Sequence, residues 1–187
     1  MNTGNSRVRG IDISLSGDGK ITRDISLTVL FGYTYTLPQT TDPHYVYAVE
    51  NPGEGFIPKQ LSYVVTSSDT TNYILKYRFQ HLAKIDVEAS YKVFTIGFSL
   101  RYYSFMQNID KTFYDIDKSG SLPSGITNYR AVHNKGDFVA DARISYTFAK
   151  HYKLALVSSN IFNREYSLRP LKIEPPRTIA IQLRADI

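Results

Sequence analysis

Residues 25–37 decide the fold class, because they read Ile-Ser-Leu-Thr-Val-Leu-Phe-Gly-Tyr-Thr-Tyr-Thr-Leu, an almost strict alternation of apolar and small or polar side chains. Successive side chains of a β-strand point to opposite faces, so a period of two predicts a strand with one apolar and one polar face. Strands of soluble proteins average about 5–6 residues. A stretch this long is therefore typical of an extended sheet with long strands.

The same alternation recurs along the rest of the chain, and no segment of useful length has helical periodicity. Together with the first stretch it predicts seven strands and an all-β fold. The other six stretches are residues 11–16, 83–91, 94–103, 138–148, 152–157 and 179–187.

The connections between these strands alternate in length. In an up-and-down sheet, such alternation places every short turn at one end and every long loop at the other. This asymmetry, with strands of about 9–11 residues, is typical of outer-membrane barrels. We therefore predict an antiparallel up-and-down transmembrane β-barrel segment, with about seven long strands of a partial barrel. The short connections are 17–24, 92–93 and 149–152, and the longer ones are 38–79, 108–134 and 163–175.

Composition excludes several function classes. The chain has no cysteine, which excludes disulfides, Cys-ligated zinc, iron–sulfur clusters and thiol nucleophiles. Residues 1–24 lack the apolar core of a signal peptide, and no run approaches the 20 or so apolar residues of a membrane helix. The net charge of +5 permits an anionic partner and requires none.

Aromatic side chains gather at the ends of the predicted strands. The chain has 15 Tyr and 10 Phe, residue types that suit a half-buried sheet surface. Their placement predicts the two aromatic girdles that membrane barrels form at the lipid interfaces. Tyr91, Phe94, Tyr146, Phe148 and Tyr152 flank the short turns, and Tyr33, Tyr35, Tyr102 and Phe105 lie near the long loops.

The second face of the predicted strands carries charged residues. In a membrane barrel this face would line a wet lumen, whereas in a soluble sandwich or a lipocalin-like barrel it would face solvent. These residues either line a ligand path or pair with opposite charges on neighbouring strands, and pairing is the interpretation we favour. The lumen or ligand-path candidates are Arg101, Asp141, Arg143 and Arg184.

The long loops contain three weaker patterns. Asp115–Gly120 matches the first half of an EF-hand calcium loop, but position 12 is Ile126, so we expect a solvated turn. His44 and His133 lie in the long loops, where either could serve as a haem or metal ligand. Residues 76–79 (KYRF) interleave basic and aromatic side chains like a nucleic-acid binder, but are more simply a segment entering the membrane near lipopolysaccharide phosphates. We expect no nucleic-acid partner, no cofactor and no catalytic residue.

Four segments, in this order along the chain, carry a family resemblance. Residues 6–12 read SRVRGID, 136–146 read GDFVADARISY, 160–166 read NIFNREY and 175–178 read PPRT. They resemble the R-x-x-G-(I/V)-E strand start, a late barrel strand, the N-L-F-(N/D)-x-x-Y box and the P-G-R entry to the closing strand of TonB-dependent outer-membrane receptors. The sequence departs from that pattern at Pro176, where glycine is usual, and at Ile187, where an aromatic residue usually ends the barrel.

The resemblance implies an importer of a scarce nutrient (a siderophore, haem, cobalamin or glycan), with loops 38–79 and 108–134 facing the ligand. Such barrels have about 22 strands around a plugged lumen, so residues 1–187 would be the C-terminal part of the barrel, without the plug domain. The implied location is the outer membrane. A passive porin-like barrel and a soluble β-sheet binding module are the alternatives.

The partners that the resemblance implies follow from this placement. They are outer-membrane lipid and lipopolysaccharide, the remainder of the barrel with its plug domain, TonB through the missing N-terminal part, and a small nutrient ligand.

Overall fold

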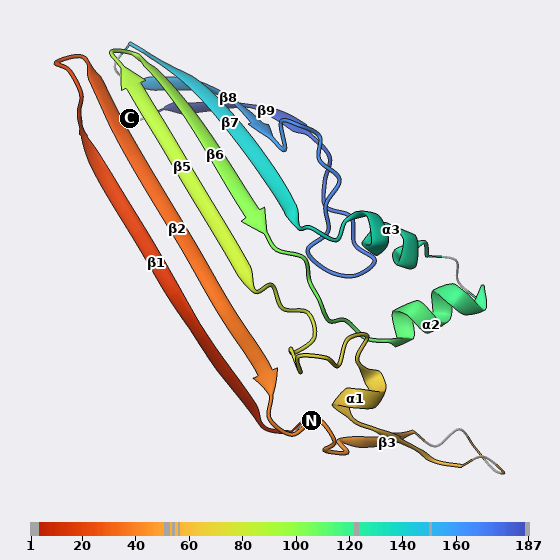
Figure 1. Ribbon diagram of the computed structural model, residues 1–187. Coiled ribbons are helices and arrows are strands. Elements are labelled where there is room, and N and C mark those ends of the chain that lie inside the picture. Colours follow the sequence, from red (N-terminus) through yellow and green to blue (C-terminus); the bar gives the residue numbers. More distant parts are fainter. Residues whose placement is uncertain are drawn as a thin grey trace.

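The computed structural model describes residues 4–50, 53, 55, 57–121, 124–149 and 151–185, and its main element is one antiparallel sheet of seven strands. The strands are neighbours in chain order, so the sheet is up-and-down (Figure 1). The predicted all-β fold with seven long strands is confirmed. The strands are β1 (Ser6–Lys20), β2 (Ile25–Thr40), β5 (His81–Tyr91), β6 (Phe94–Tyr103), β7 (Asp137–Phe148), β8 (Tyr152–Ser159) and β9 (Thr178–Ala185).

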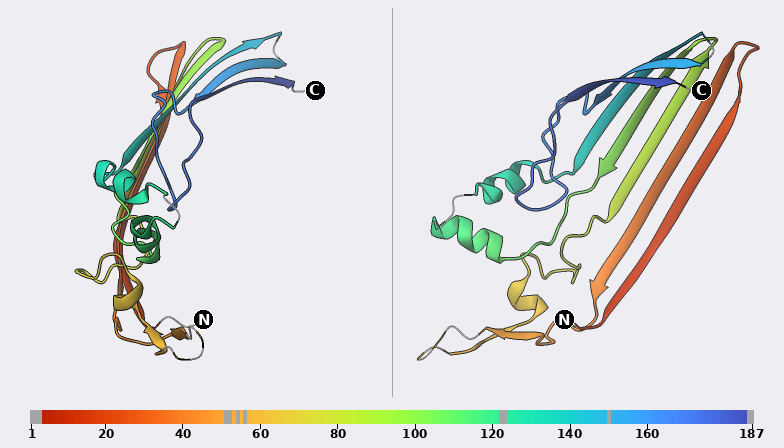
Figure 2. Two further views of the ribbon diagram at one scale, coloured as in Figure 1. Left: turned by 90° about the vertical axis from the view of Figure 1, so that its right-hand side faces the viewer. Right: turned by 180° about the vertical axis from the view of Figure 1, so that it is seen from behind.

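The sheet is open, with β1 and β9 as its edges. The short turns lie at one end of the strands and the long connections at the other, as the alternation of lengths predicts (Figure 1). Figure 2 shows β7, β8 and β9 curling toward one side, which gives the sheet the shape of part of a barrel wall. The predicted turn residue Lys150 and the terminal Ile187 lie outside the described residues.

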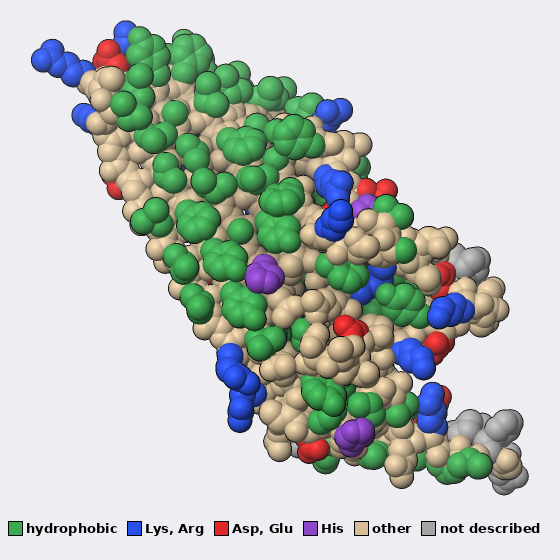
Figure 3. All heavy atoms as spheres, in the orientation of Figure 1, with side chains coloured by type: hydrophobic (Ala, Val, Ile, Leu, Met, Phe, Trp, Pro, Cys, Tyr) green, Lys and Arg blue, Asp and Glu red, His purple; other side chains and the backbone are tan. Residues whose placement is uncertain are grey.

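The strand register separates the two faces of the sheet. Apolar rows run straight across it, as in the partners Phe31, Ile85 and Leu100 of β2, β5 and β6. Figure 3 shows this convex face as a continuous apolar surface, and its side chains are open to the surroundings, with Ile181 77% and Ile96 58% exposed. Soluble monomers rarely expose apolar patches above a few hundred Å². The charged residues of the strands face the concave side.

Aromatic rings line both ends of the convex face. At the loop end, the ring centroids of Tyr102 and Phe138 are 4.6 Å apart, and the Tyr33 hydroxyl lies 2.9 Å from Nδ1 of His81. At the turn end, four rings follow one another with centroids between 5.1 and 6.0 Å apart. The four are Phe94, Tyr146, Phe148 and Tyr152.

The first hairpin differs from the sequence prediction. A strand over 11–16 followed by a turn over 17–24 is wrong, because β1 continues to Lys20 and leaves only four residues for the turn. Gly17 and Gly19 belong to the ladder and pair with residues of β2. Glycine adopts turn conformations and extended conformations with similar ease. Here both glycines are extended because they pair with the long strand β2.

The long connections contain folded elements, which corrects the prediction of no helical segment. Two of the helices are eight and seven residues long, too short to show a clear helical period in the sequence. They pack around a small core of Met106, Ile109 and Ile126. We call the described residues of the first two long connections, within 41–80 and 104–136, the loop unit. No helix in the described ranges is long and apolar enough to cross a membrane. The elements are β3 (Ala48–Glu50), β4 (Lys59–Leu61), α1 (Tyr63–Thr66), α2 (Thr112–Ser119) and α3 (Ile126–Val132).

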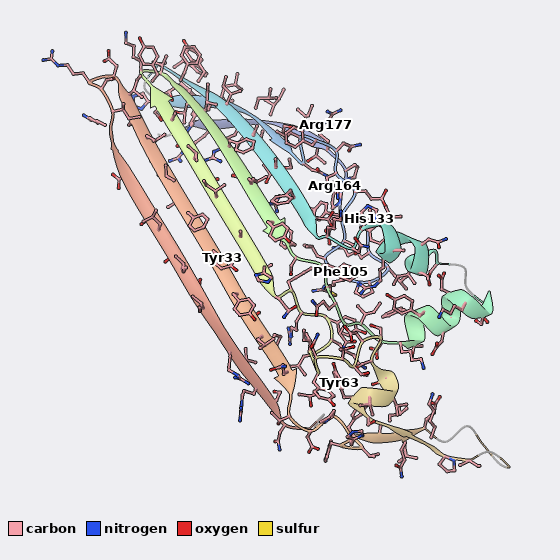
Figure 4. The ribbon with its side chains drawn as sticks, viewed as in Figure 1. Tyr33, Tyr63, Phe105, His133, Arg164 and Arg177 are labelled. Atoms are coloured by element: carbon pink, nitrogen blue, oxygen red, sulfur yellow. The ribbon has the colours of Figure 1, made fainter. Side chains whose placement is uncertain are left out.

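Arg130 of α3 fastens this loop unit to the end of β6. Its guanidinium donates to the Tyr114 hydroxyl at 2.6 Å and to the Met106 carbonyl at 2.7 Å. It also lies 4.5 Å from the ring centroid of Phe105. Phe105, which the sequence places with the loop-end aromatic row, therefore packs inside the loop unit, where Figure 4 labels it.

The segment that resembles a calcium loop is largely exposed, as expected, but it forms the end of α2 and not a turn. Gly120 ends the helix in the left-handed region, with φ 71°. The Asp117 carboxylate accepts the N–H groups of Thr127 at 3.1 Å and of Gly125 at 2.8 Å, and the Ser124 hydroxyl at 3.0 Å. These bonds, that of Thr127 first, lower the pKa of Asp117 to about 2. Asp117 thus joins α2 to α3.

Candidate functional site

The concave face brings Arg101 and Asp141 together as an ion pair. Nη2 of Arg101 on β6 is 2.7 Å from Oδ2 of Asp141 on β7. The other carboxylate oxygen of Asp141 accepts the N–H of Asn160 at 2.8 Å. One aspartate therefore ties the middle of the sheet to the connection between β8 and β9.

Arg143 on β7 reaches across β6 to two carboxylates on β5. Its Nη2 is 2.9 Å from Asp86 and 2.9 Å from Glu88. The β6 residue that pairs with both Arg143 and Glu88 is Gly97. A Cβ at Gly97 would overlap the Arg143 side chain, so an alanine here would force the guanidinium to shift. The resulting cluster links three consecutive strands.

Arg184 lies in different electrostatic surroundings. It pairs in register with Lys153, so two positive side chains stand directly opposite each other on β8 and β9. Like charges at such positions repel. Both residues line, with Glu88 and Arg143, a cavity of about 210 Å³ on the concave face.

The NIFNREY segment (residues 160–166) folds the last long connection against the sheet. Asn160, only 3% exposed, accepts the N–H of Arg164 and donates to its carbonyl oxygen, both at 2.8 Å. Tyr166 is buried, and its ring lies parallel to that of Tyr103 with centroids 6.5 Å apart. Arg164, labelled in Figure 4, forms an ion pair with Asp137 of β7, with Nε 3.1 Å from Oδ1. The segment therefore has a structural role, because it holds the connection between β8 and β9 against the sheet.

At the loop end, Asn108 joins the first two long connections. It is 1% exposed and comes from the second connection, whereas all of its side-chain partners lie in the first. Its Nδ2 donates to the Tyr63 hydroxyl at 2.9 Å and to the Ile74 carbonyl at 2.7 Å. Its Oδ1 accepts the N–H groups of Ser68 at 3.1 Å and of Asp69 at 3.2 Å. Every polar atom of this buried amide is satisfied.

A charged cluster lies beside this amide. Lys76 Nζ is 2.5 Å from Oδ1 of Asp110 and donates to Oγ1 of Thr66 at 2.8 Å. The Tyr77 hydroxyl donates to the other oxygen of Asp110, and burial together with that bond raises the pKa of Tyr77. Two side chains of the KYRF segment are therefore engaged in the loop junction.

A cavity of about 250 Å³, which we call the mouth cavity, opens between this junction and the loop ends of β1 and β2. Its lining includes the tyrosines Tyr47 and Tyr63 and the cations Lys76 and Arg78. Burial raises the pKa of Tyr63 to about 12, so the phenol stays protonated at neutral pH; Figure 4 labels it. Arg78 is exposed, and within the described residues it forms no salt bridge. Aromatic surface beside an unneutralised guanidinium suits an anionic, ring-bearing small molecule.

The two candidate histidines lie apart in the fold. His44 is exposed in the connection between β2 and β3. His133 follows α3, and its ring stacks on Tyr129 with centroids 4.2 Å apart; it is labelled in Figure 4. Across the described ranges, no group of three or more His, Asp or Glu side chains could hold a metal ion. A haem or metal role for either histidine stays a prediction.

Sequence reasoning did not single out Gly97 or Asn108. The sequence does contain a pattern that points to Gly97, because this glycine occupies a polar position of β6 between charged residues of the two neighbouring strands. No sequence pattern points to Asn108, because its partners Tyr63 and Ile74 are 45 and 34 residues away.

The comparisons with known proteins show the fold. No protein-family model and no curated protein matches this sequence significantly. The structure is similar to the ferric-catecholate import receptor Fiu from K12 E. coli, in its closed crystal form, with a TM-score of 0.57 and 20% identity. The match covers 96% of this chain and 21% of that one, so the chain spans about a fifth of the receptor's length. The chain thus has the fold of part of a TonB-dependent-receptor-like barrel.

Proposed function

We propose that this chain forms part of the barrel wall of an outer-membrane receptor, which imports a small nutrient with energy supplied through TonB. The observation that carries the proposal is the two-faced sheet, with an exposed apolar convex face and a charged concave face. Phe94 and Tyr102, in the two aromatic rows at opposite ends of β6, are about 26 Å apart along the strand. At the usual strand tilt of about 35–45° this spacing is about 18–21 Å along the membrane normal, which is of the order of the apolar band of about 25 Å between the aromatic girdles of such barrels.

Within this proposal the mouth cavity captures the ligand, and the paired charges of the concave face line the lumen near the plug. Fiu is a ferric-catecholate import receptor. For this chain we propose the wider class of anionic, ring-bearing nutrients, such as siderophores or haem, because Arg78 and the tyrosines Tyr47 and Tyr63 line the cavity. The remaining barrel strands, the plug and TonB are the expected partners.

Detergent dependence tests the membrane placement. We expect the chain to give a β-rich circular dichroism spectrum and a monodisperse sedimentation profile only in detergent micelles or lipid. A monodisperse monomer in plain buffer would contradict the placement and favour a soluble binding module. Coding sequence for a plug domain upstream of this chain would distinguish a receptor from a passive barrel, and its absence would remove the receptor assignment.

Ligand binding tests the mouth cavity separately. Binding of a ferric catecholate, a ferric hydroxamate and haem is measured by tyrosine fluorescence quenching in detergent. Arg78→Ala should weaken the binding of the anionic ligand about tenfold, as expected for loss of one charge-assisted hydrogen bond. Arg23→Ala, in the turn between β1 and β2, removes the same charge at the opposite end and should have no effect. Equal ligand affinities of the parent chain, Arg78→Ala and Arg23→Ala would show that the mouth cavity is not the ligand-binding site.

A further inference from the structure

On the convex face, the described strands carry a pair of arginines at the edge of the sheet. Arg7 and Arg9 belong to β1 and share the outward register of Ile11, Ile13 and Leu15. Their partners on β2 are Gln39 and Leu37, so no opposite charge faces them across the ladder. Both are exposed.

Among the described residues of the seven strands, the outward positions hold no carboxylate and no other cation apart from one histidine. The register gives these positions as apolar, aromatic, glycine, serine and glutamine residues, His81, and the two arginines. The described residues include no ion pair to Arg7 or Arg9. Two positive charges therefore lie at the margin of a large apolar surface without a counter-charge from that face.

The position of the pair along β1 is specific. Ile13 is in register with Tyr33 of the loop-end aromatic group, and Arg9 lies beyond it toward the N-terminal end of the strand. Figure 3 shows basic side chains at that lower margin of the apolar surface. At the turn end, the basic residues Lys20, Arg23 and Lys92 lie near two carboxylates: Asp18 and Asp24 are close to Lys20 and Arg23 in sequence, and the Lys92 N–H donates to the Asp24 carbonyl at 3.4 Å.

We propose that Arg7 and Arg9 bind the phosphate of an anionic lipid headgroup in the membrane leaflet next to the loops. The inference rests on the proposed membrane placement and adds a specific site to it. Alternate residues of a strand are about 7 Å apart on one face, so two guanidinium groups converge on one phosphate. Each donates paired N–H groups, which match the geometry of phosphate oxygens. The apolar side chains beside them contact the acyl chains.

The test uses the chain in dodecyl maltoside micelles and native mass spectrometry, with phosphatidic acid as the phosphomonoester probe and phosphatidylcholine as the neutral one. We expect retained phosphatidic acid and little phosphatidylcholine. Arg7→Ala/Arg9→Ala should lower the apparent affinity at least tenfold, while Arg7→Lys/Arg9→Lys keeps an intermediate affinity because the charge remains without the paired donors. Arg23→Ala/Lys92→Ala, at the turn end, should bind like the parent chain.

The outcomes separate this proposal from the membrane placement. Equal retention of both lipids by a chain that still requires detergent would overturn the phosphate site alone. A chain that is monomeric without detergent would overturn the placement and the site together. Displacement of phosphatidic acid by millimolar inorganic phosphate would show an anion site without lipid specificity and would overturn the lipid assignment. Unchanged circular dichroism spectra of the variants exclude loss of fold as the cause.

Discussion

The sheet and the loop unit are held together by different means. The sheet has a long ladder of backbone hydrogen bonds, but its convex face has no apolar partner within the described chain. The loop unit has almost no ladder, and a few buried polar groups position it, above all Asn108. A repetitive structure tolerates many local changes, whereas a structure built on single contacts fails when one of them is lost. Variants in each region should therefore damage that region and spare the other.

The largest effect is expected for Asn108→Ala. The substitution removes every side-chain hydrogen bond of this amide and leaves the Asp69 N–H without its partner. The Ser68 N–H keeps the Ile109 carbonyl, and the Ile74 carbonyl keeps the Tyr63 hydroxyl. One unsatisfied group costs about 1–3 kcal/mol and each of the other lost bonds about 0.5–1.5 kcal/mol, so the loop unit should lose about 3 kcal/mol of local stability. Amide hydrogen exchange in micelles should accelerate across residues 62–80 and remain unchanged in β5 and β6.

Asn134→Ala is the matched control, because that exposed amide makes a single hydrogen bond to Ala131. It should leave exchange in both regions unchanged. Accelerated exchange of the strands in Asn108→Ala would mean that the loops hold the sheet together, and the proposed difference between the regions would be wrong.

The extent to which the sequence predicts each region follows from the same difference. The alternation within 25–37 is local and repetitive, so it predicts the strand, its faces and the aromatic rows. Asn108 depends on partners far along the chain, and the short helix α2 has no clear period, so neither is visible in the sequence. The ion pair of Arg143 is intermediate. The charge of Arg143 predicts that its side chain lies on the concave face. Its contact with the carboxylates of β5, however, depends on Gly97 of β6, the strand that lies between β5 and β7.

Within the sheet, Gly97→Ala should have the second-largest effect. The added methyl group would overlap Arg143 and displace it from Asp86 and Glu88, which leaves two carboxylates without their cation. Because these groups are partly exposed, about 2 kcal/mol is expected rather than the 3–5 kcal/mol of a fully buried pair. The denaturant midpoint in micelles should fall accordingly.

Gly32→Ala is the control for this change. Gly32 lies on the same concave face, on β2, and an added Cβ would meet nothing within 4 Å. It should be neutral or slightly stabilising. In a double-mutant cycle, Gly97→Ala should cost little once Arg143 is alanine. Additive costs would show that the glycine acts through the backbone and not through the ion pair.

Tyr63→Phe should have a smaller effect on the loop unit. It removes the hydroxyl that donates to Ile74 at 2.6 Å and accepts from Asn108, at a cost of about 1.5 kcal/mol. Burial raises the pKa of this phenol from 10.0 to about 12, so its contribution is complete below pH 10 and is lost as the pH rises toward 12. Exchange in the parent loop unit, corrected for the intrinsic rate, should therefore increase above pH 10. The same increase in Tyr63→Phe would assign it to another group.

The smallest effect is expected at Asp117, which joins α2 to α3 from the surface. Its hydrogen bonds lower its pKa from 3.8 to about 2. A carboxylate with a lowered folded-state pKa stabilises above the unfolded value, and this contribution is lost as the pH falls from about 4 through 2. Carbon-13 NMR of the carboxyl group should give a midpoint near 2, and the amide signals of Gly125 and Thr127 should shift with it. Asp115→Asn, on the same helix, should leave the titration unchanged, whereas Asp117→Asn should abolish it. A midpoint near 4 would mean that α3 is not held by this carboxylate, and the dependence of the loop unit on single polar contacts would then be limited to the buried amide of Asn108.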